Sequence, residues 1–139
     1  MVQLIVGKKG KGKTKQLLDK VNSEIKVVSG SIVYLDKSTK HMYELNNKVR
    51  LVDVSQFMIS SSDEFIGFVS GVISQDHDLQ QMYFDSFLKI ACLEGQDIEP
   101  IITKLEKLSA SFEVDFILSI SLDEEELPAS LKDKIMVSL

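Results

Sequence analysis

Cysteine is almost absent from this chain. Cys92, the only one, excludes an internal disulfide and a metal site built from several thiolates, and its apolar neighbours predict a buried thiol. No apolar run approaches the roughly 18 residues of a membrane span. The apolar run at residues 2–6 is too short for a secretory leader, and lysines follow it. We therefore expect a cytoplasmic protein without membrane association.

Excess positive charge is also lacking, because the formal net charge is −5. A general nucleic-acid-binding surface is therefore not indicated. Lysines crowd residues 8–20, but no aromatic residue is interleaved with them as a surface that stacks single-stranded bases requires. Repeats, low-complexity stretches and linkers are absent. With 44% hydrophobic and 27% charged residues, we expect residues 1–139 to form a single domain.

A glycine-rich motif is the most informative feature that is present. Residues 7–14 read GKKGKGKT, which matches the phosphate-binding P-loop pattern G-x-x-x-x-G-K-[ST]. The β-branched run at residues 2–6 precedes the motif and predicts a strand. Residues 15–25 follow it and predict a helix, with four apolar residues at helical spacing: Leu17, Leu18, Val21 and Ile25. This order of strand, loop and helix predicts a nucleotide-binding site.

Each position of the motif has a physical role. Gly7 and Gly12 permit left-handed or crowded backbone angles around a phosphate. Main-chain N–H groups of the loop and of the following helix then form an anion-binding nest. We predict that Lys13 contacts the β- and γ-phosphates as a catalytic residue and that the Thr14 hydroxyl ligates Mg²⁺. The predicted nucleotide-binding residues are Gly7, Lys8, Lys9, Gly10, Lys11, Gly12, Lys13, Thr14 and Lys15.

Strands and helices alternate along the rest of the chain, which predicts an α/β three-layer sandwich with a mostly parallel central sheet. The further predicted strands are residues 31–36, 49–54, 80–85, 115–121 and 134–139, with Met42, Tyr43 and Leu45 as possible edge-strand residues. A second helix begins at Ser61, where Glu64 completes a capping box. Gly67 and Gly71 lie inside this helix, and their spacing predicts close packing against the sheet.

A third helix begins near Pro100 and continues with an apolar stripe to Phe112. Residues 87–93 form a loop or a helical turn, and residues 126–132 form a short helical connection. The acidic residues 123–126 predict a solvated loop or a helix start.

A P-loop requires a carboxylate at the end of a buried strand to hold the Mg²⁺ shell. Asp36, Asp53 and Asp85 all occupy such a position. We favour Asp85 as a catalytic and metal-binding residue, because it ends a strand that follows the second helix. Asp36 and Asp53 remain alternatives.

With these residues, the chain resembles the P-loop NTPase superfamily, in particular its RecA-like ATPase group and small bacterial P-loop ATPase-like proteins. The resemblance implies ATP and Mg²⁺ as ligands. GTP is less favoured because no N-K-x-D motif occurs. The resemblance also implies that Ser119 or Ser121 contacts the γ-phosphate. Lys8 resembles the signature lysine of partitioning and Min-type ATPases, although Lys9 stands where that family has glycine.

Two departures argue against fast hydrolysis. Ser86 follows Asp85, where many ATPases of this group have a glutamate that orients water. Arg50, the only arginine, lies inside a predicted strand, so an arginine finger must come from a second subunit or a protein partner. We therefore expect a slow ATPase with a conformational or assembly output. The alternatives are a non-catalytic, nucleotide-regulated interaction module and a small nucleoside or metabolite kinase. His41 and His77 are expected to be surface residues.

Overall fold

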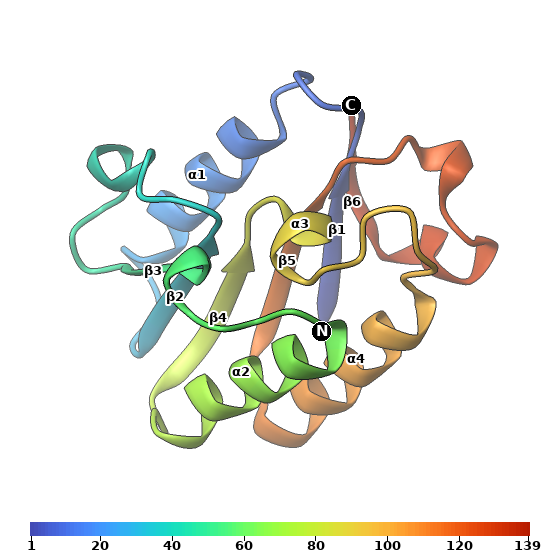
Figure 1. Cartoon of the computed structure of the whole chain (residues 1–139). Helices are drawn as coiled ribbons and strands as arrows, with labels where there is room; N and C mark the ends of the chain where they lie inside the picture. The colour runs from blue at the N-terminus through green and yellow to red at the C-terminus, as the bar shows by residue number, and fades with distance from the viewer.

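A computed structural model describes residues 1–139 as a twisted sheet with helices on both faces (Figure 1). The strands are β1 (Val2–Val6), β2 (Ser31–Asp36), β3 (Arg50–Asp53), β4 (Leu79–Phe84), β5 (Asp115–Ile120) and β6 (Ile135–Ser138). The helices are α1 (Lys13–Glu24), α2 (Ser62–Ser74), α3 (Phe87–Ile90) and α4 (Glu99–Phe112). None of them has the length and hydropathy that a membrane-spanning helix requires.

The six strands form one sheet in the order β3-β2-β4-β5-β1-β6, and every neighbouring pair is parallel. The predicted α/β class with a mostly parallel sheet is therefore confirmed, and the sheet is parallel throughout. β5 lies between β1 and β4, so the strand before the glycine loop and the strand before Asp85 are separated by one strand. In a parallel sheet all carboxyl ends lie at one edge, where ligands bind in open α/β sheets.

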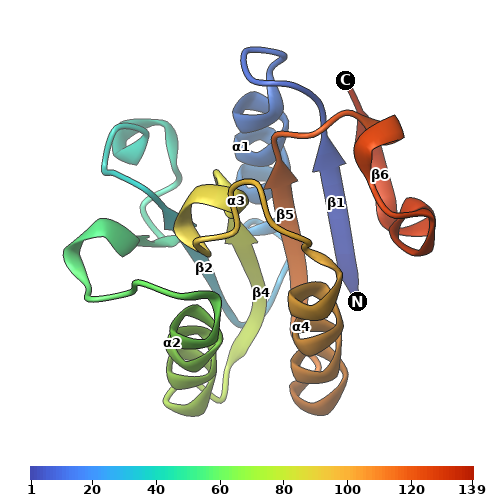
Figure 2. The same cartoon turned by 45° about the vertical axis from the view of Figure 1, so that its right-hand side comes forward.

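Two hydrophobic clusters cover the two faces of the sheet. Helix α1 packs on one face, with a cluster of 11 buried residues that includes Leu17, Tyr34 and Tyr83. Helices α2 and α4 lie side by side on the other face, over a cluster of 26 buried residues (Figure 2). Side chains alternate between the faces along each strand. In β1, for example, Leu4 belongs to the larger cluster and Ile5 to the smaller one.

Several local expectations are corrected. Residues Met42–Glu44 form a 3-10 helix rather than an edge strand, and Tyr43 is 92% exposed. Gly67 and Gly71 are exposed, and a Cβ at either would meet no atom within 4 Å, so they do not allow close packing against the sheet. Cys92 is only half-buried, and its thiol donates to the main-chain oxygen of Ile59.

The start of α2 follows the prediction with one change. The Ser61 hydroxyl accepts a hydrogen bond from the Glu64 N–H at 3.1 Å. The Glu64 carboxylate, however, accepts from the N–H and the hydroxyl of Ser60, not from the N–H of Ser61. These hydrogen bonds lower the pKa of Glu64. Elsewhere, residues 87–93 begin with the helical turn α3, and Pro100 lies in the first turn of α4, as expected.

Candidate functional site

Three polar side chains meet at the carboxyl edge of the sheet because of strand alternation. Tyr34, Tyr83 and Ile117 all belong to the cluster under α1. Asp36 lies two residues after Tyr34, Asp85 two after Tyr83, and Ser119 two after Ile117. All three polar residues are 2% exposed. A period of two keeps them on the α1 face of the sheet. The glycine loop reaches this face from the neighbouring strand β1.

The glycine loop joins β1 to α1 with backbone angles that favour glycine. Gly12 is the residue that precedes α1, and its φ of 98° is in the left-handed region. Gly7 has a φ of 150°, and a Cβ there would lie 3.0 Å from the Cβ of Leu139. Helix α1 starts at Lys13, so its free N–H groups and the positive end of its dipole lie beside the loop.

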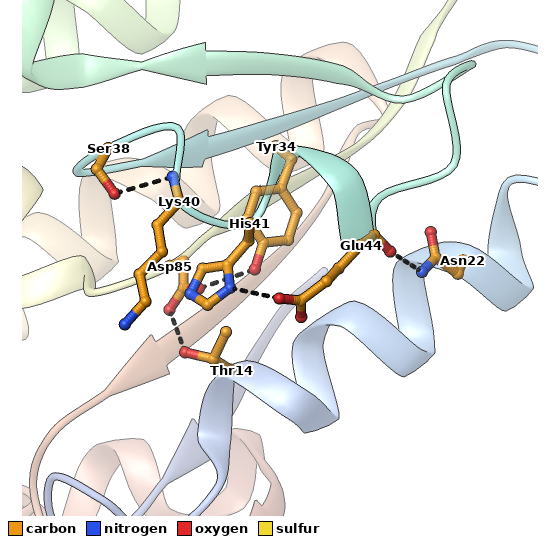
Figure 3. A network of polar contacts seen from close by, with 8 residues as sticks. All are labelled: Thr14, Asn22, Tyr34, Ser38, Lys40, His41, Glu44 and Asp85. Atoms are coloured by element: carbon orange, nitrogen blue, oxygen red, sulfur yellow. Dashed lines mark hydrogen bonds and ion pairs between the residues drawn. The ribbon is translucent and has the colours of Figure 1, made fainter.

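Asp85 is bound by three hydroxyl groups from three different elements, and Figure 3 shows the bonds from Thr14 and Tyr34. Its Oδ1 accepts from Thr14 Oγ1 on α1 at 3.2 Å and from Ser119 Oγ on β5 at 3.1 Å. Its Oδ2 accepts from the Tyr34 hydroxyl on β2 at 2.8 Å. Burial, and next the Asp85 carboxylate, raises the pKa of Tyr34 far above its ordinary value, so the phenol stays a donor. The structure therefore brings the predicted residues Thr14 and Asp85 into direct contact.

Lys13 is folded back onto its own loop. Its side chain is 7% exposed, and Nζ donates to the main-chain oxygen of Lys8 at 3.1 Å. Burial lowers the pKa of Lys13, and the charge of Asp85 opposes this effect. The ammonium is thus bonded to the loop, and no hydrogen bond or ion pair joins it to Asp85.

Asp36 is the least satisfied group of the site. Its Oδ1 accepts from the N–H of Lys37 at 2.7 Å, whereas its buried Oδ2 has no hydrogen-bond partner. Burial, and next the charge of Asp85, raises the pKa of Asp36. Sequence reasoning offered Asp36 only as an alternative to Asp85, but the two carboxylates lie on neighbouring strands and face the same pocket.

A pocket of about 730 Å³ covers this edge of the sheet. Five lysines line it, namely Lys9, Lys13, Lys37, Lys40 and Lys89. Of the other residues predicted for the site, it is lined by Gly10, Gly12, Thr14, Asp85, Ser119 and Ser121. This size is ordinary for small-molecule sites, and the surplus of lysines favours an anionic ligand.

Four predicted nucleotide-binding residues do not line this pocket: Gly7, Lys8, Lys11 and Lys15. Lys8 forms an ion pair with Asp123 at 3.4 Å. Lys15 pairs with Asp19 on the exposed side of α1 at 2.9 Å and lines a smaller neighbouring pocket. These lysines therefore contribute to the charge around the site rather than to its walls.

Asp53 and Arg50 lie away from the pocket. Asp53 caps a 3-10 helix by accepting from the N–H and hydroxyl of Ser55, which lower the pKa of Asp53. Of the three candidate aspartates, only Asp53 is therefore outside the site. Arg50 pairs with Asp76 at 3.1 Å.

His41 was expected at the surface, and it lies there half-buried rather than freely exposed. Its side chain is 22% exposed, and it lines both pockets, with Nδ1 3.4 Å from Glu44 Oε1. The residue follows β2 through a loop and precedes a 3-10 helix, so no regular spacing links it to the site. His77, in contrast, is exposed as expected.

Ser86 has a strained backbone directly after Asp85. Its φ of 54° and ψ of 50° are left-handed, which costs a non-glycine residue on the order of 1 kcal/mol. Its N–H donates to Ser119 Oγ at 3.1 Å, and Ser119 in turn donates to Asp85. The bend thus connects the ends of β4 and β5 and fixes the hydroxyl of Ser119.

No protein-family model matches the chain, and no curated protein has a significant sequence match to it.

Proposed function

We propose that this chain is a P-loop nucleotide-binding domain that binds ATP with Mg²⁺, and GTP less well, and hydrolyses ATP slowly. The observation that carries this proposal is the 3.2 Å contact between the Thr14 hydroxyl and Asp85 beneath a glycine loop. A hydroxyl at the start of the helix and a carboxylate at the end of a buried strand are the two protein groups that hold Mg²⁺ in such sites.

The residues of the site suit the two ligands. Thr14 and Asp85 offer oxygen atoms, which Mg²⁺ prefers over nitrogen or sulfur. When bound, Mg²⁺ would neutralise charge on the β- and γ-phosphates. The lysines of the pocket and the N–H groups of the loop suit a polyphosphate. Ser119 and Ser121 line the same pocket and are candidates for contacting the terminal phosphate.

Slow turnover follows from what surrounds Asp85. The residue that follows Asp85 in the chain is Ser86, whose N–H is bonded to Ser119, so the glutamate that orients the attacking water from this position in many ATPases is missing. Arg50 is held by Asp76 outside the pocket. An arginine finger is worth several orders of magnitude in rate, and here it would have to come from a second copy of the chain or a protein partner. The output we propose is therefore a change of conformation or assembly.

The experiment is thermal unfolding and calorimetric titration with ATP, ADP or GTP, each with Mg²⁺ or with a chelator. At a hundredfold excess over Kd a ligand stabilises by about 2.7 kcal/mol, which is a shift of roughly 6–10 °C for this size. Lys13→Ala is expected to abolish the shift. Lys107→Ala is the matched control, because Lys107 is an exposed lysine on α4, across the sheet.

The outcomes separate the proposal from its rivals. An ATP-dependent shift that needs Mg²⁺ and Lys13 supports the proposal, and phosphate release would then measure turnover. Tight binding without any turnover favours a non-catalytic, nucleotide-regulated module. Phosphate transfer to a nucleoside or another metabolite favours a kinase. If none of the nucleotides shifts the unfolding temperature, or if Lys13→Ala shows the same shift as the wild type, the proposed nucleotide site is contradicted.

A further inference from the structure

Asp36, His41 and Asp85 form a cluster inside the pocket. One carboxylate oxygen of each aspartate and one ring nitrogen of His41 all lie within 4.8 Å of one another. Both aspartates are 2% exposed, and their partners are hydroxyl and main-chain N–H groups rather than cations. Two carboxylates buried side by side repel each other, and a cation between them would relieve the repulsion.

The buried Oδ2 of Asp36 is a separate indication of a ligand. It is the one buried side-chain oxygen or nitrogen of the chain without a hydrogen-bond partner. An orphaned buried carboxylate oxygen is costly unless water or an ion completes its shell. The proposed Mg²⁺ site uses Thr14 and Asp85 and leaves this oxygen unexplained.

His41 is oriented in the way that ligating histidines are. Its Nδ1 lies 3.4 Å from Glu44 Oε1, and in Figure 3 the opposite edge of the ring lies toward Asp85. A carboxylate that accepts from Nδ1–H fixes the tautomer with a free lone pair on Nε2 and strengthens that nitrogen as a ligand. Glu44 thus lies where the outer partner of a ligating histidine would lie.

We propose that Asp36, His41 and Asp85 bind a divalent first-row transition cation, such as Mn²⁺, Co²⁺ or Zn²⁺, in the absence of nucleotide. Two carboxylates and an imidazole suit these cations, whereas Mg²⁺ favours oxygen ligands and keeps several waters. Bonds of about 2.0–2.2 Å require the ligand atoms to approach by roughly 1–2 Å. His41 is the ligand that makes most of this approach, because it lies in a loop before a 3-10 helix, whereas both aspartates lie at the ends of paired strands.

The test is titration of the metal-free, nucleotide-free full chain with Co²⁺, followed by visible absorption, and with Mn²⁺, followed by calorimetry. We expect one equivalent to bind. His41→Ala should weaken binding by about tenfold or more, since even the loss of an outer-shell partner costs 10–100-fold. Asp36→Asn, which keeps the shape of the side chain, should do the same. His77→Ala is the matched control, since His77 is the other histidine of the chain and is exposed.

Absence of binding at millimolar metal, or equal affinity in His41→Ala and the wild type, would overturn the proposal. The Lys13→Ala variant separates a failure of the proposed metal site from a failure of the proposed nucleotide site. It is expected to lose the response to ATP and to keep the response to Co²⁺, because Lys13 donates no bond to the cluster. The two sites are therefore tested by separate readouts on the same variants.

Discussion

The Tyr34 hydroxyl is expected to be worth more than an ordinary buried hydroxyl, because its acceptor is the Asp85 carboxylate. The hydrogen bond is 2.8 Å long, and both groups are buried. Tyr34→Phe removes the hydroxyl without removing the ring, and Oδ2 of Asp85 then loses its only partner within the chain. Bonds to charged groups contribute about 1.5–3 kcal/mol. We expect a loss of roughly 2–3 kcal/mol in the free energy of unfolding.

Tyr83 offers a matched comparison. Its ring is stacked on that of Tyr34, with centroids 6.2 Å apart, and it is equally buried. Its hydroxyl donates to the uncharged Oε1 of Gln81 at 2.7 Å. Tyr83→Phe therefore removes the same hydroxyl group from a neutral hydrogen bond. We expect this change to lower the free energy of unfolding by about 1 kcal/mol.

Urea unfolding of metal-free and nucleotide-free protein at pH 7 measures both losses. The difference between Tyr34→Phe and Tyr83→Phe should be about 1–2 kcal/mol, or roughly 3–7 °C in Tm. In a double-mutant cycle with Asp85→Asn, Tyr34→Phe should show a coupling energy of the order of 1 kcal/mol. Equal losses in the two tyrosine variants, together with no coupling to Asp85, would refute the reasoning.

Two further variants test the carboxylates and the start of α2. In the folded chain the pKa of Asp36 is raised above its unfolded value of about 3.9. Its contribution to stability is thus full below that value and is lost as the pH rises through the folded pKa. In thermal unfolding without metal, Asp36→Asn should therefore be more stable than the wild type at pH 7, and this difference in stability should be smaller near pH 4. A difference that does not change with pH would contradict the prediction. Ser61→Ala removes the cap of Glu64 N–H and should cost about 1 kcal/mol in urea unfolding, whereas the exposed Ser111, in the last turn of α4, should tolerate alanine.

The sequence predicted the order of strands and helices well, because short apolar runs and helical spacing are local signals. It also predicted that the glycine loop and Asp85 would meet, since both follow strands of one parallel sheet. Tyr34 was missed because a tyrosine in an apolar strand has no local mark of function. Counting in steps of two from Tyr34 to Asp36 and from Tyr83 to Asp85 would have placed these side chains on one face.

The loop after β2 could not be predicted in the same way. Its residues have neither a period of two nor a helical period, and they include a short 3-10 helix without a buried residue. Asn22 of α1 bonds the main chain at Glu44 and Asn46, which fixes the loop over the pocket. His41 reaches the carboxylates only through this loop, so its place depends on contacts that no spacing rule contains.

The hydrogen bonds of the site also set how ligand binding has to be measured. In the structure Lys13 is bonded to Lys8 O and Thr14 to Asp85, so a nucleotide with Mg²⁺ must replace both bonds. Each neutral bond is worth about 1 kcal/mol net and each bond to a charge about 1.5–3 kcal/mol. The free energy of binding therefore reflects the difference between the bonds to the ligand and the internal bonds that they replace. Lys13→Ala loses the internal bond as well as the phosphate contact, so its own Tm will change. Only the shift that ligand adds to each variant isolates the contribution of Lys13 to binding.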